Sequence, residues 1–134
     1  MTHPMDDNSD FTDAFCEFLQ LSVRTVDGAE LLLAIAEDRD RKWTARDLVS
    51  RVEPAATLSE SEAAKYLEVF QQRGLVAAET GGVRYRPISP QIEAHVTTLG
   101  RLYNERPVTL IRVIYALRDA KIKTFADAFK IWGK

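Results

Sequence analysis

The chain has 134 residues, 46% hydrophobic and 28% charged, a composition typical of a single globular domain with an apolar core. Its N-terminal stretch is acidic and lacks an apolar leader, and no apolar run approaches the roughly 20 residues of a membrane span, so we expect a cytoplasmic protein without a membrane segment. One cysteine excludes an internal disulfide, and two isolated histidines offer no metal-ligand cluster, so we expect no metal and no cofactor.

Charge is unevenly distributed along the sequence. The formal net charge is -2, but residues 1–23 hold five acids and no base, which leaves 18 bases against 15 acids in the remainder. The excess of bases is strongest in residues 99–134. Because the local distribution of charge matters more than its sum, this composition is compatible with a nucleic-acid partner.

One aromatic pattern occurs near both ends of the chain, as FTDAFCEF (11–18) and FADAFKIW (125–132). Aromatic residues at i, i+4 and i+7 lie on one face of a helix, so each segment predicts a short amphipathic helix. These aromatic residues are Phe11, Phe15 and Phe18 in the first segment and Phe125, Phe129 and Trp132 in the second. Acids flank the first and lysines the second, which favours docking of the two helices, either within one chain or between subunits.

Four helices are expected to begin where an N-cap side chain is followed three residues later by a carboxylate. The pairs are Asp27 with Glu30, Thr44 with Asp47, Ser59 with Glu62, and Thr124 with Asp127. With Gly74 as a C-terminal stop, the first three starts predict helices over residues 27–38, 44–52 and 59–73.

Strand character follows Gly74, where LVAAE (75–79) and VRYRP (83–87) flank a TGG turn and predict a β-hairpin. In its second strand Val83 and Tyr85 point one way, and Arg84 and Arg86 the other. A brief third strand is expected at 42–44. Ser89 and Pro90 then predict a helix over 90–106, which Pro107 interrupts or restarts.

The order of these elements over residues 26–88 resembles the winged helix-turn-helix superfamily, in particular MarR-like bacterial transcriptional regulators. The runs TARDLVSRV, SESEAAKYLEVFQQRGLVA and ETGGVRYRP carry the resemblance, and QQRGLVAAETGGVRYRP is its most specific part. It implies a mainly α fold with a small β-hairpin. We therefore expect one domain over 1–134, with a winged-helix core (26–88), an acidic N-terminal helix (1–25) and a C-terminal helical extension (89–134).

In that superfamily the third helix commonly enters the major groove and the wing contacts the DNA backbone. The resemblance therefore implies a DNA-binding transcriptional regulator that contacts duplex DNA through helix 59–73 and wing 79–87. Carried over by position, its DNA-binding residues are Arg46, Arg51, Ser59, Ser61, Lys65, Gln72, Arg73, Arg84 and Arg86.

Acidic residues on helix 59–73 depart from this pattern, because Glu60, Glu62 and Glu68 oppose a polyanion. The alternative is a winged-helix adaptor that binds another protein and no DNA, since a fold does not fix a function. An enzyme is not expected, because no nucleophile–base grouping, glycine-rich phosphate loop or metal motif is present. The lone Cys16 fits either a redox switch or ordinary core packing.

The segment VTLIRVIYAL (108–117) is apolar at every position except Thr109 and Arg112. A helix that is apolar around most of its circumference must be covered on more than one side. One explanation is a homodimer through residues 107–134, with Leu110, Ile111, Ile114 and Tyr115 at the interface. The other is a helix buried within one chain, with the two aromatic segments packed on its flanks.

Overall fold

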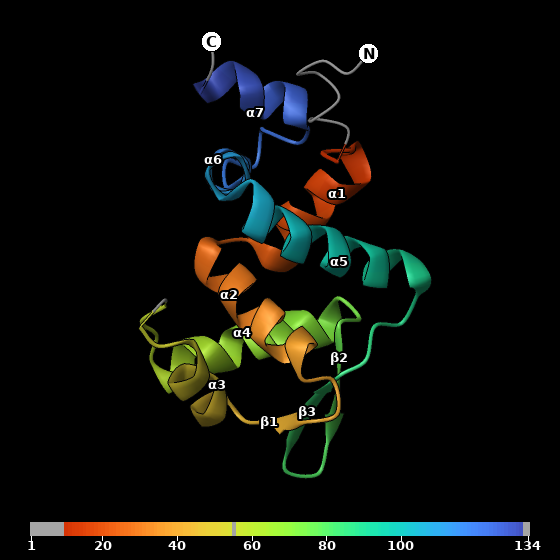
Figure 1. Ribbon diagram of the computed structural model, residues 1–134, viewed down its shortest axis with the longest axis vertical. Helices are drawn as coiled ribbons and strands as arrows, with labels where there is room; N and C mark the ends of the chain where they lie inside the picture. Colours follow the sequence, from red (N-terminus) through yellow and green to blue (C-terminus); the bar gives the residue numbers. More distant parts are fainter. Residues whose placement is uncertain (1–9, 55, 133–134) are drawn as a thin grey trace. The chain divides into compact units, whose positions relative to one another are not determined.

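The computed structural model describes residues 10–54 and 56–132 and is mainly helical, with a small antiparallel sheet (Figure 1). Two compact units make up the described chain. One consists of the residues up to Val26 together with those from Arg101 onward, and the other is Asp27–Gly100. Helix α5 (Pro90–Glu105) contributes residues to both units. Among the described residues, no helix combines the length and apolar character needed to cross a bilayer.

The sheet-containing unit follows the predicted order of elements closely. After α2 (Val26–Glu37) come β1 (Lys42–Trp43), α3 (Ala45–Val52) and α4 (Glu60–Gln72), and then β2 (Val76–Glu79) and β3 (Gly82–Tyr85). The strands pair antiparallel in the order β1-β3-β2, so the strand that precedes α3 lies beside the last strand of the hairpin.

Local side-chain chemistry sets the ends of these helices. Thr44 with Asp47, and Ser59 with Glu62, form complete capping boxes at the starts of α3 and α4, as predicted. The predicted N-cap at Asp27 is wrong, because α2 already begins at Val26 and Asp27 lies in its first turn. A carboxylate there still interacts favourably with the positive end of the helix dipole.

Helix α4 ends at the predicted glycine. Gly74 has φ +78°, its N–H donates to the Gln71 carbonyl over 3.2 Å, and the Leu75 N–H donates to the Phe70 carbonyl over 2.8 Å. This pair of bonds satisfies carbonyls that the helix end would otherwise leave without a partner. The chain then turns directly into β2.

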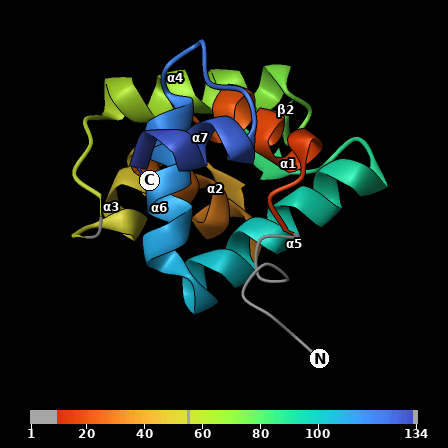
Figure 2. The same ribbon diagram turned by 90° about the horizontal axis from the view of Figure 1, so that it is seen from above.

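The other unit contains α1 (Asp13–Phe18), a π-helical turn η2 (Leu19–Val23), α6 (Pro107–Leu117) and α7 (Phe125–Trp132). Figure 2 shows α7 crossing α6, in agreement with the contacts between them. Pro107 occupies the first turn of α6, so it starts a new helix after α5. The side chains of Phe129 and Trp132, assigned to the second aromatic segment, lie outside the described part of the structure.

Helix α6 buries one face within its own unit. Leu110, Val113, Ile114 and Leu117 are at most 2% exposed. Two of the four residues predicted for a dimer interface, Leu110 and Ile114, therefore lie in the core of a single chain, because they share the buried helical face. Ile111 is half-buried, while Tyr115 is 59% exposed.

Candidate nucleic-acid interface

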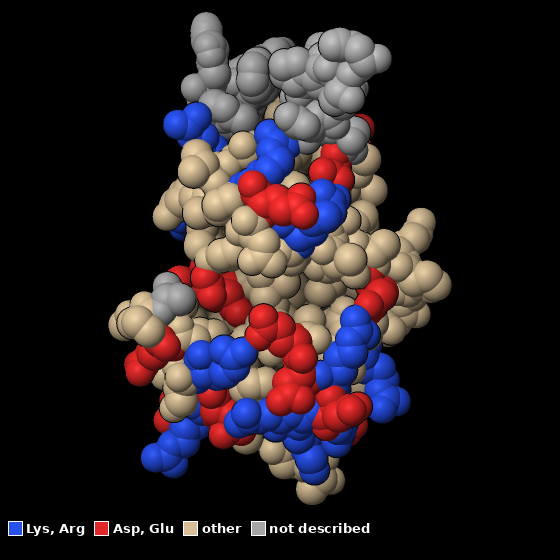
Figure 3. Space-filling model, in the orientation of Figure 1, with Lys and Arg blue, Asp and Glu red and all other residues tan. Residues whose placement is uncertain are grey.

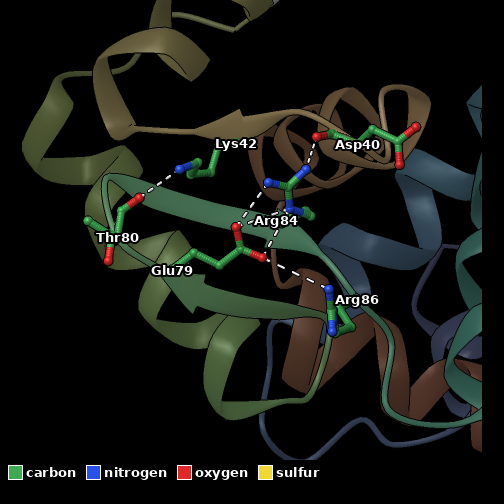
Figure 4. Close-up of polar contacts among 6 residues, drawn as sticks. All are labelled: Asp40, Lys42, Glu79, Thr80, Arg84 and Arg86. Atoms are coloured by element: carbon green, nitrogen blue, oxygen red, sulfur yellow. Dashed lines mark hydrogen bonds and ion pairs between the residues drawn. The ribbon is translucent and has the colours of Figure 1, made fainter.

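The β2–β3 hairpin and the adjoining strand β1 bring several basic side chains together (Figure 4). Glu79 pairs with Gly82 across a two-residue turn, and Lys42 of β1 is the register partner of Arg84. Gly82 permits the close approach of β1 to β3, because a Cβ atom on Gly82 would lie 2.5 Å from the carbonyl oxygen of Trp43. Lys42 in turn donates from Nζ to the Thr80 carbonyl in the turn over 2.9 Å.

Arg84 is held in place by an acidic neighbour. Its Nε and Nη2 donate to the Glu79 carboxylate over 3.0–3.1 Å, and its Nη1 donates to the Asp40 carbonyl (Figure 4). These bonds lower the pKa of Glu79 and raise the pKa of Arg84. The Arg84 side chain is only 28% exposed, so its main role is to stabilise the hairpin, and little of its surface is available to a ligand.

Arg86 is better placed to meet a ligand. It follows the end of β3, its side chain is 66% exposed, and its Nη2 lies 3.9 Å from Glu79. Arg84 and Arg86 thus share one carboxylate (Figure 4) but differ in exposure. We expect Arg86, the more exposed of the two, to lose less free energy than Arg84 when its guanidinium leaves Glu79 and binds a phosphate.

Two basic residues near the hairpin are absent from the set predicted from the sequence. Lys42 reaches the turn, and the guanidinium of Arg41 lies 4.0 Å above the centre of the buried Trp43 ring. The run KWT predicts the strand, but the antiparallel register with Arg84 depends on residues far away in sequence. Only that register brings Lys42 beside the β2–β3 hairpin.

The predicted basic residues of α3 are both exposed and both paired. Arg46 is 85% exposed, with its Nε 3.8 Å from Glu60 of α4. Arg51 donates to Glu37 of α2 over 2.6 Å. The first pair is the looser of the two, which leaves Arg46 as the basic side chain of α3 that most readily reaches a new partner.

Helix α4 presents most of its predicted reading residues on the surface. Ser61, Lys65, Gln72 and Arg73 are exposed. Ser59 is exposed as well, but its hydroxyl accepts from the Glu62 N–H over 3.0 Å, while Glu62 accepts from the Ser59 N–H over 2.9 Å. Ser59 therefore caps the helix. If its hydroxyl also contacts a base, it must still accept the bond from the Glu62 N–H.

The same contacts explain two of the three carboxylates that seemed to oppose a polyanion. Glu62 completes the cap of α4, and Glu60 pairs with Arg46. Glu68 is exposed, without such a structural contact among the described residues. On the face shown in Figure 3, acidic and basic side chains are intermixed over the part of the surface that carries the strands.

A second network fastens the hairpin to the start of α5. The Tyr85 hydroxyl donates to Glu93 over 2.8 Å, and Arg39 donates to the same carboxylate while its guanidinium lies 4.9 Å from the centre of the Tyr85 ring. Bonding to Arg39 is the main reason why the pKa of Glu93 is lowered. These contacts connect Tyr85, the last residue of β3, to α5 and to Arg39 of the segment before β1.

Burial shifts the pKa values of the lone Cys16 and of His95, one of the two histidines. Burial and the nearby charge of Asp13 raise the pKa of the Cys16 thiol to about 11, and Cys16 is 0% exposed, so it is a core residue with little thiolate. The pKa of His95 is lowered by burial. Across the described ranges, no three potential ligands lie together as a metal site would require.

Comparison of the chain with protein-family models, curated proteins and solved structures found no match.

Proposed function

We propose that residues 26–88 form a winged helix-turn-helix domain and that the protein is a transcriptional regulator that binds duplex DNA through α4 and the β2–β3 hairpin. The observation that carries the proposal is the topology. Three helices precede a hairpin, and β1, which precedes α3, completes the sheet in the order β1-β3-β2. This order supports the assignment of α4 as the groove-reading helix and β2–β3 as the wing.

In the proposed interface, one set of side chains contacts the DNA phosphates and another contacts the bases. Arg86, Lys42 and Arg46 are exposed cations of the wing, the neighbouring strand and α3, and they suit phosphate contacts. Ser61, Lys65 and Gln72 of α4 and Arg73 at its C-cap are exposed, and they suit contacts with base edges in the major groove.

Ion pairs on this surface do not prevent binding. Exposed pairs such as Arg46–Glu60 and Arg86–Glu79 contribute about 0–1 kcal/mol each, because water screens them and holding two long side chains costs entropy. A DNA phosphate that replaces the carboxylate also releases condensed counterions. The acidic residues therefore weaken nonspecific binding and favour sites where base contacts add affinity.

Salt dependence of binding is the direct test of the proposal. Fragments of genomic DNA enriched on the intact protein would supply a specific duplex, and fluorescence anisotropy would then measure its affinity over a range of salt concentrations. Each phosphate contact contributes about 0.9 to the slope of log affinity against log salt. We expect Arg86→Ala and Lys42→Ala each to reduce the slope by about one, and Lys121→Ala, in the other unit, to leave it unchanged. An intact chain that binds no duplex even at low salt would refute the proposal.

The carboxylates favour a second candidate, a winged-helix adaptor that binds protein. Glu60, Glu62 and Glu68 are all exposed on α4, the helix that should approach DNA. On this account the helix presents a mixed-charge surface to a basic partner. Affinity that falls on replacement of these glutamates, together with absent DNA binding, would support the adaptor.

We also propose that the regulator acts as a homodimer paired through the outer face of α6. Val108 and Tyr115 are 63% and 59% exposed there, and half-buried Ile111 lies between them. Twofold pairing would let two half-sites bind as one unit. Sedimentation equilibrium of the intact chain and of Tyr115→Asp tests this: we expect a dimer that the variant dissociates without unfolding. A monomeric intact chain at micromolar concentration would exclude the dimer and leave DNA binding to a single domain.

A further inference from the structure

An open cleft of about 830 Å³ lies within the unit formed by the two ends of the described chain, and none of the proposed DNA-binding residues lines it. Its lining comes from α1, from the π-helical turn η2 and the residues after it, and from the segment between α6 and α7. The volume falls in the range of sites that take small molecules.

Charged side chains of both signs surround this cleft. Five of them line it, namely Asp13, Glu17, Arg24, Arg118 and Lys123. Within the described ranges, none of the five forms an ion pair, whereas Arg39, Arg84 and Arg101 each contact a carboxylate. The cleft therefore concentrates charges of both signs that form no ion pair with any described residue.

The two signs come from different segments. Asp13 and Glu17, four residues apart on α1, supply the carboxylates, while Arg118 and Lys123 belong to the segment between α6 and α7. Leu21, 37% exposed, adds apolar surface to the same cleft, whereas Leu117, which also lines it, is only 1% exposed. A ligand that satisfies this lining carries one positive end, one negative end and an apolar body.

The backbone beside the cleft departs from regular geometry at the residues that line it. The Arg24 N–H donates to the Leu19 carbonyl over 2.7 Å, which is the i to i+5 bond of a π-turn. Arg24 itself has φ +71°, a rare conformation for a residue with a side chain, and its Nε donates to the Leu21 carbonyl over 3.1 Å. Such turns and strained residues are frequent at functional sites.

Gln20, which also lines the cleft, connects η2 to the end of α6 and the segment that follows it. Its side-chain amide donates to the carbonyls of Leu117 and Ile122 over 2.8 Å and 2.6 Å, with the Asp119 carbonyl at 3.3 Å. These bonds hold the segment that carries Arg118 and Lys123 against η2. The charges are thus presented from a preorganised segment, which lowers the entropy lost when a ligand binds.

We propose that this cleft binds a short peptide with free termini and apolar side chains. Its ammonium group pairs with Asp13 and Glu17, its carboxylate pairs with Lys123, Arg118 and Arg24, and its apolar side chains cover Leu21. The site does not depend on the proposed DNA binding, and its occupancy is measured without DNA.

The test uses the intact ¹⁵N-labelled chain titrated with the dipeptide Leu-Leu, with its N-acetyl form and with its C-terminal amide, each followed by NMR. We expect Leu-Leu to shift the amide signals of Arg24 and Lys123 but not those of Lys65 and Arg84. Each blocked form should bind about tenfold more weakly, because it loses one charge-assisted contact. Absence of binding by Leu-Leu, or equal binding of all three forms, would overturn the proposal.

Two variants assign the ends of the ligand. Glu17→Gln should weaken Leu-Leu about tenfold and leave the N-acetyl form unaffected, since that form has no ammonium group. Lys123→Gln should weaken Leu-Leu similarly and leave the amide unaffected. Lys121→Gln, an exposed residue of the same segment outside the lining, is the matched control. Equal losses for blocked and unblocked forms in either variant would contradict the assigned orientation.

Discussion

The rings of Phe11 and Phe125 stack with their centroids 4.9 Å apart and their planes inclined by 21°. The two similar aromatic segments near the ends of the chain therefore meet within one molecule. Phe11 also contacts Phe15, and Phe15 contacts Phe18, at centroid distances of 6.0 Å and 6.1 Å. The four rings for which contacts are described thus form one aromatic cluster inside a single chain, to which both copies of the repeated pattern contribute.

Removal of the Phe11 ring should destabilise this cluster. Phe11 is 5% exposed, so we expect Phe11→Ala to reduce the free energy of unfolding by about 3 kcal/mol, from lost burial and the cavity left behind. Combined with Phe125→Ala in a double-mutant cycle, it should show a coupling of about 0.5–1.5 kcal/mol. Urea denaturation would measure both, and a coupling indistinguishable from zero would contradict a stabilising contact between the rings.

Replacement of Gln20 by Glu should be costly because a carboxylate cannot donate to the three carbonyls that the amide serves. We expect a loss of about 2–3 kcal/mol at neutral pH, and a smaller loss at acidic pH where a protonated Glu regains one donor. Thermal unfolding of both proteins across pH would show this. Gln20→Met, which keeps the size but removes all polar contacts, separates lost bonds from repulsion.

Gly74→Ala tests the turn that ends α4. A residue with a side chain is strained at φ +78°, and its Cβ atom would lie 2.6 Å from Cδ1 of Ile88. We expect a loss of about 1–2 kcal/mol from the backbone, with a small added steric cost, because Ile88 is 76% exposed and can move. The double variant Gly74→Ala with Ile88→Ala should recover only the steric part. Full recovery would show that the backbone strain is negligible.

Glu93 predicts a specific loss of stability in acid. Arg39, and to a lesser extent Tyr85, hold the pKa of Glu93 below its ordinary value of 4.5. A lowered folded-state pKa means that the carboxylate stabilises the fold above about pH 4.5, and that this contribution disappears as the pH falls through the folded-state pKa. Glu93→Gln keeps an acceptor for Tyr85 but removes the charge, so its unfolding free energy should change less between about pH 5 and about pH 3. Glu68→Gln is the control, and identical acid profiles for Glu93→Gln and the unchanged protein would contradict the linkage.

Local chemistry explains why most element boundaries could be predicted from the sequence. The residues that set these boundaries act on the backbone within a few positions of themselves, so their effect can be predicted without tertiary information. They are Thr44, Ser59, Gly74 and Pro107. The π-turn η2 was not predicted, because its i to i+5 bonding has no distinct sequence pattern.

Long-range pairing explains most of what the sequence did not reveal about the candidate interface. Arg84 has outward parity, as predicted, but its binding to Glu79 and the Asp40 carbonyl depends on hairpin register and on the position of β1. Arg51 meets Glu37 only because α2 and α3 come together in the fold. Parity predicts the face on which a side chain lies, whereas its availability depends on neighbours that fold next to it.

The pairing of β1 with β3 also has a consequence for the order of folding. Lys42 and Arg84 are adjacent in the sheet, but both α3 and α4 lie between them in the chain. Closing such a long loop loses entropy that only a few strand contacts return, so β1 should join the sheet after the helices and the hairpin have formed. Changes in β1 should then accelerate unfolding and leave the folding rate almost unaltered. The edge of the sheet formed by β1 would thus be the first part of this unit to open and the last to close.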